Sequence, residues 1–119
     1  MAVPGWPAGV DPPEAPEWQR SAAAWLADLC PPEYRSYPVL RRHPVVAARM
    51  AARHVDAALA GARAGLAAVR VELADVVPPQ VIEEAVSVYE QEVARLLAVR
   101  REVALVERAL EGQRPRSRP

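Results

Sequence analysis

The sequence predicts an all-helical fold, in which a long, coiled-coil-like antiparallel helical hairpin carries a short N-terminal helix packed on it. Between residues 45 and 110 apolar residues recur at heptad spacing in two runs, separated by the sequence Val77-Pro78-Pro79-Gln80. The apolar half of the chain is mostly Ala, Val and Leu, with no Phe, a composition typical of closely packed helices. We expect a three-helix unit that dimerises.

Composition limits the class of protein. A chain of 119 residues has room for one domain. The single Cys30 excludes an intrachain disulfide, and no apolar run approaches the length of a membrane span, so we expect a cytoplasmic protein that does not enter a membrane. All fifteen basic residues are Arg, as GC-rich codons favour, which indicates a bacterial source.

Residues 1–16 are rich in proline and contain two glycines, so they cannot sustain a helix, and we expect a disordered arm. Trp6 within this arm is either an anchor onto the bundle or a contact for a partner. A tryptophan in such a segment is most often a weak local contact, which is the interpretation we favour.

The apolar spacing of residues 17–29 predicts a helix, the first of a helical domain that extends from 17 to 111. Its apolar residues fall on one face, and Pro31-Pro32 ends it. That face consists of Trp18, Ala22, Trp25, Leu26 and Leu29. The basic, tyrosine-containing connector 33–43 suits either a solvated linker or a contact with phosphates and bases; we favour the linker.

Two long helices are predicted at 44–76 and 79–111. The seam of each helix consists of the first and fourth positions of its heptads. In the first helix all ten seam positions from Val45 to Val76 are apolar, whereas the second has one charged seam residue, Glu92. The short turn between them forces the helices to be antiparallel. Gly112 sits where a helix cap belongs, and residues 112–119 predict a disordered, Arg-rich tail.

Antiparallel pairing predicts a register in which facing residue numbers sum to about 156. This register places Arg49 against Glu107 and Asp56 against Arg100, with opposite charges in both pairs. It also places Arg63 near Glu92, and we expect these two to form a structural ion pair because a partly buried carboxylate is costly without a cation.

A second face of helix 44–76 carries small residues, and this face needs a cover. The spacing of the glycines suits close approach of another helix, with a flexible or kinked helix as the alternative. Either helix 17–29 or a second copy of the chain covers the face, and the amount of apolar surface favours a homodimer. The candidate interaction residues are Trp18, Trp25, Ala58, Gly61, Gly65 and Ala68.

Catalytic signals are weak. Cys30 has no histidine near it in sequence, and His43 and His54 share no metal-ligand spacing with other residues. We therefore expect no catalytic residue, cofactor or metal, and a non-catalytic, self-associating adaptor or scaffold that also binds an unidentified protein.

Nucleic-acid association is the alternative function. It would use the C-terminal tail and arginines that gather at the open end of the hairpin, although zero net charge argues against bulk electrostatic binding. The arginines of this predicted basic end are Arg41, Arg42, Arg49, Arg53, Arg100, Arg101 and Arg108.

Overall fold

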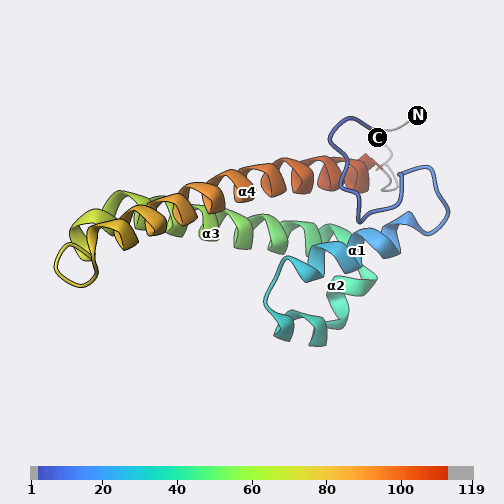
Figure 1. Cartoon of the computed structure of the whole chain (residues 1–119). Coiled ribbons are helices and arrows are strands. Elements are labelled where there is room, and N and C mark those ends of the chain that lie inside the picture. The colour runs from blue at the N-terminus through green and yellow to red at the C-terminus, as the bar shows by residue number, and fades with distance from the viewer. Residues whose placement is uncertain (1–2, 113–119) are drawn as a thin grey trace, which may run out of the picture.

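The computed structural model describes residues 3–112, which form helices and turns without a strand (Figure 1). Two long helices, α3 (Pro44–Glu72) and α4 (Pro79–Gly112), run side by side in opposite directions. The predicted fold class is confirmed, because a short helix, α1 (Trp18–Asp28), packs on this hairpin. The molecule is a rod with principal extents of 61 × 33 × 28 Å.

The connection between α1 and α3 contains two short helical elements. A 3₁₀ turn, η1 (Pro32–Ser36), begins at the second proline of the pair that follows α1, and a single turn of helix, α2 (Pro38–Arg42), precedes α3. Each of α2, α3 and α4 begins at a proline, where the missing N–H is not needed and the backbone angle already suits a helix. The prolines therefore set the helix boundaries.

The turn of the hairpin begins earlier than the heptad pattern predicts. α3 ends at Glu72, and the backbone N–H groups of Val76 and Val77 both donate to the carbonyl oxygen of Leu73. A proline disfavours helical backbone in the residue before it, so the chain leaves the helix ahead of Pro78. As a result Val76, assigned to the seam by its spacing, is 70% exposed.

The predicted register is confirmed at two ion pairs on one side of the hairpin. Arg49 Nε lies 2.7 Å from Glu107 Oε2, and Arg100 Nε donates to Asp56 Oδ1 at 2.7 Å. A second carboxylate, that of Glu111, accepts a hydrogen bond from Arg49 at 2.8 Å.

The third predicted pair, Arg63 with Glu92, does not form. Glu92 instead accepts two hydrogen bonds from Arg95, three residues further along its own helix. Its side chain is 42% exposed, so it leaves the seam for water and needs no cation from α3. The hydrogen bond from Arg95 lowers the pKa of the Glu92 carboxyl.

The core is concentrated at the open end of the hairpin, where α3 begins and α4 ends. There α1 and α2 form a third layer, and the buried residues are Val10, Trp18, Ala22, Leu26, Leu40, Ala47, Ala48, Ala51, Ala52, Val103, Val106 and Leu110. A smaller cluster of Val55, Leu59, Ala62 and Leu96 continues between α3 and α4. Between residues 66 and 92 only Val69 is buried.

Residues 3–16 of the N-terminal arm pack on the bundle, contrary to our expectation of disorder, whereas residues 1–2 lie outside the described residues. Val10 and Pro7 are buried, and the ring of Trp6 lies 5.9 Å from that of Trp18. Trp6 Nε1 also donates to the carbonyl oxygen of Val10 at 3.0 Å. Proline prevents a helix here, but turns bring these few apolar side chains onto the bundle, so Trp6 is an anchor.

The predicted disordered tail begins within a helix, because Gly112 is the last residue of α4. The remaining residues of that prediction, 113–119, lie outside the described residues. No helix within residues 3–112 is long and apolar enough to cross a membrane.

Candidate interaction surfaces

Most of the predicted interaction residues serve the interior of the domain. Trp18 is buried beneath the N-terminal arm, and Trp25 is half-buried with its ring against Gly9. A Cβ atom on Gly9 would lie 2.9 Å from Trp25 Cδ1, so this glycine permits the contact. Both tryptophans therefore fix α1 and the arm to the hairpin.

Gly61 and Gly65 have opposite surroundings. A Cβ atom on Gly65 would overlap the ring of Tyr89 at Cε1, whereas one on Gly61 would meet nothing within 4 Å. Gly65 thus gives room to a ring from α4, and Ala58 packs against the smaller core cluster. Of the predicted residues, Gly61 and the half-buried Ala68 lie toward solvent.

The side of α3 that faces away from α4 forms an outward strip of small, uncharged residues about four turns long. Val71 in this strip is 82% exposed, more than any other large hydrophobic residue that the structure describes. Six members of the strip are exposed and Ala68 is half-buried: Ala57, Ala60, Gly61, Ala64, Ala67, Ala68 and Val71. The sequence identified Gly61 and Ala68 of this strip as small residues of a second face, but not its other members, which lie outside the heptad seam.

Opposite charges flank the outward strip. Arg53 lies one turn before Ala57, and Asp75 lies just after the end of α3; both are exposed. Neither forms an ion pair within residues 3–112. A positive charge at one end and a negative charge at the other make the strip complementary to itself when two copies run antiparallel.

The arginines of the predicted basic end do not form one continuous site. Arg49 and Arg100 are engaged by carboxylates of the hairpin, as described above. Arg101 and Arg108 line a hollow on α4 beneath the N-terminal arm. Arg41 and Arg42 belong to α2, and Arg53 lies at the end of the outward strip.

A cavity of about 570 Å³ opens between α1, η1, α2 and the start of α3. Its wall on α1 is built from alanines, and tyrosines and arginines of the connector 33–43 complete it. The composition of this connector predicted a solvated linker and gave no indication of a cavity. The basic, tyrosine-containing composition of the connector was the one sequence feature that indicated a binding site. The cavity itself depends on how α2 packs beside α1, which the sequence pattern does not predict.

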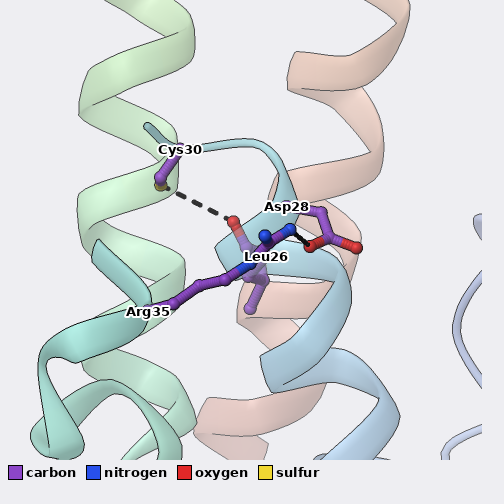
Figure 2. Close-up of polar contacts among 4 residues, drawn as sticks. All are labelled: Leu26, Asp28, Cys30 and Arg35. Carbon is purple, nitrogen blue, oxygen red and sulfur yellow. Dashed lines mark hydrogen bonds and ion pairs between the residues drawn. The ribbon is translucent and has the colours of Figure 1, made fainter. Parts of the chain in front are cut away.

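Polar contacts hold the turn that follows the C-terminal end of α1. Figure 2 shows Arg35 donating to the Asp28 carboxylate and the Cys30 thiol directed at the carbonyl oxygen of Leu26, 3.6 Å away. Burial raises the pKa of the Cys30 thiol, which keeps it protonated at neutral pH. This is the environment of a structural cysteine, because a reactive one needs a lowered pKa.

Metal ligands do not cluster in this part of the chain. Within residues 3–112 no group of three or more His, Cys, Asp or Glu side chains is placed to hold a metal ion. His54 instead packs against Tyr34, with ring centroids 6.5 Å apart.

Comparison with protein-family models, curated proteins and solved structures gave no match to this chain.

Proposed function

We propose that the protein is a non-catalytic helical interaction module that self-associates, and that the outward strip of α3 forms the interface of a homodimer. The observation that carries this proposal is an exposed helix face that stays uncharged from Ala57 to Val71. Soluble proteins seldom leave a continuous apolar face uncovered unless it binds something.

A two-fold axis near Ala64 gives the interface a specific geometry. Two antiparallel copies of α3 then meet with residue numbers that sum to about 128. Ala57 faces Val71 of the second copy, and Gly61 faces Ala67. In the same arrangement each Arg53 faces Asp75 of the other copy, so both flanking charges gain an opposite partner.

Small side chains let the two backbones approach closely, so that van der Waals contact replaces the hydration of the strip. The contact spans about 20 Å of helix, and it buries less than a standard interface of about 1,600 Å². The two exposed ion pairs contribute about 0 to 1 kcal/mol each and mainly fix the direction. We therefore expect reversible association in the micromolar range.

The test is sedimentation velocity over a concentration series. The native chain should shift from monomer to dimer, and Ala64→Glu should remain a monomer because two carboxylates would meet on the axis. Ala94→Glu, at an exposed alanine of α4, is the matched control and should still dimerise. A native chain that stays monomeric up to millimolar concentration would exclude the dimer.

Charge reversal tests the register of the same interface. Arg53→Asp should weaken dimerisation because it faces Asp75, and adding Asp75→Arg should restore it. If the double variant is as weak as the single one, the copies do not meet in this register.

Adaptor function also requires a second, unidentified protein. The uncovered half of α4 near the turn supplies a surface for it, since Val88 is 64% exposed. The proposal places the protein in the cytoplasm, on the evidence of a single cysteine. Salt-sensitive binding to generic duplex DNA by the Ala64→Glu monomer would instead favour nucleic-acid association through Arg101, Arg108 and α2.

A further inference from the structure

The cavity between α1 and α2 is lined by small apolar and by aromatic side chains. Ala23, Ala24 and Ala27 supply the wall, and their methyl groups leave the space open. Tyr34 and Tyr37 also line the cavity, with ring centroids 5.7 Å apart. A volume of about 570 Å³ falls in the range of small-molecule sites, about 300 to 1,000 Å³.

The cavity is also strongly cationic. Arg20, Arg35, Arg41 and Arg42 line it, against a single carboxylate, that of Asp28. Asp28 is already engaged by Arg35, and Arg20 lies 3.4 Å from Glu17 outside the cavity.

Two guanidinium groups keep their charge available. Arg41 donates to the carbonyl oxygen of Arg35, which does not neutralise it, and the Arg42 side chain has no hydrogen bond or ion pair among the described residues. A planar guanidinium with free N–H groups is suited to bidentate binding of a carboxylate.

We propose that this cavity binds a small aromatic carboxylate. The ring system lies against the alanine wall, facing the tyrosines, and the carboxylate meets Arg41 and Arg42. Apolar contact supplies part of the affinity, and the guanidinium pair selects an anion over a neutral or cationic molecule of the same shape. This site is separate from the proposed dimer interface, which lies on the far half of α3.

The charge selectivity can be measured by NMR on the full ¹⁵N-labelled chain in its Ala64→Glu form, which keeps dimerisation out of the measurement. Titration with 2-naphthoate should give saturable amide shifts confined to residues 19–28 and 34–44. Titration with 2-naphthalenemethanol, which has the same ring system but no charge, should give at least tenfold weaker binding. Shifts scattered over the whole rod, or equal affinity for the two compounds, would overturn the proposal.

Substitutions at the cavity separate its charge from its shape. Arg42→Gln should weaken 2-naphthoate binding at least tenfold and leave binding of the alcohol unchanged. Ala24→Phe, at an exposed position of the wall, should abolish both by filling the space.

Arg63→Gln on α3 and Ala94→Phe on α4, both at exposed positions, are matched controls and should bind like the parent. Each variant is compared only after its amide spectrum shows the parent fold, and Arg42→Gln decides the question if Ala24→Phe does not fold. Unchanged 2-naphthoate affinity in Arg42→Gln would show that the arginine pair is not the anion site.

Discussion

At the scale of single residues, Gly61 and Gly65 show how one residue type serves two purposes in the same helix. Glycine in a helix interior costs about 1 kcal/mol relative to alanine. At Gly65 this cost provides space for the ring of Tyr89, whereas Gly61 faces open solvent. Only close packing of another molecule against the outward strip would offset the cost at Gly61.

Alanine substitutions at these two glycines should therefore have different effects on stability. Gly61→Ala should stabilise the chain by about 0.5 to 1 kcal/mol, the propensity gain alone. Gly65→Ala should lose that gain because Tyr89 must move, and Gly65→Leu should destabilise by about 1 to 3 kcal/mol through overpacking. Urea unfolding in the Ala64→Glu background measures all three without self-association. Equal effects at the two positions would contradict the contact with Tyr89.

At the scale of elements, the register of α3 against α4 depends on the heptad seam and on a few ion pairs. Glu107 is the most enclosed acidic partner among these pairs, since its side chain is only 16% exposed. Its Oε2 atom is buried and lies 2.7 Å from Arg49 Nε, but the alignment is too poor for a hydrogen bond. Arg49 is thus the cation that compensates a half-buried carboxylate.

Removing Arg49 should cost more stability than removing an arginine without a partner. We expect Arg49→Leu to destabilise the chain by about 1 to 2 kcal/mol, because the Glu107 carboxylate loses its cation. Arg63→Leu, on the same helix and exposed, should change stability by less than about 0.5 kcal/mol. Chemical denaturation checks both; a large cost for Arg63→Leu would revive its pairing with Glu92.

At the scale of the whole molecule, the rod has a three-layered end and a two-layered end. The large core cluster lies where α1 and α2 cover the hairpin, whereas the half near the turn has two helices and one buried residue, Val69. Fewer buried contacts mean a lower free energy of local opening. The end near the turn is consequently the part most able to adapt to a partner.

Amide hydrogen exchange should follow this gradient in the Ala64→Glu monomer. Amides of α3 and α4 between residues 66 and 90 should exchange faster than those of 47–55 and 99–110, which lie in the large core. Mass spectrometry of peptides resolves these ranges. Uniform protection along both helices would show that the hairpin opens only as a single cooperative unit.

The sequence by itself determined the two long helices, the place of the connection between them and the register of the hairpin, but not the early end of α3 at Glu72. A repeating seam fixes which face of each helix is buried, and a short proline turn then leaves one antiparallel alignment, which is why Arg49–Glu107 and Asp56–Arg100 could be predicted. Only the tertiary structure decided the position of the N-terminal arm, the partner of Glu92 and the existence of the cavity beside α2. These depend on non-periodic contacts and on competition between nearby groups, such as Arg95 against Arg63 for Glu92. The candidate interaction surfaces were also decided by the tertiary structure. A heptad pattern identifies the buried seam, but it does not tell which of the other faces are covered by neighbouring elements.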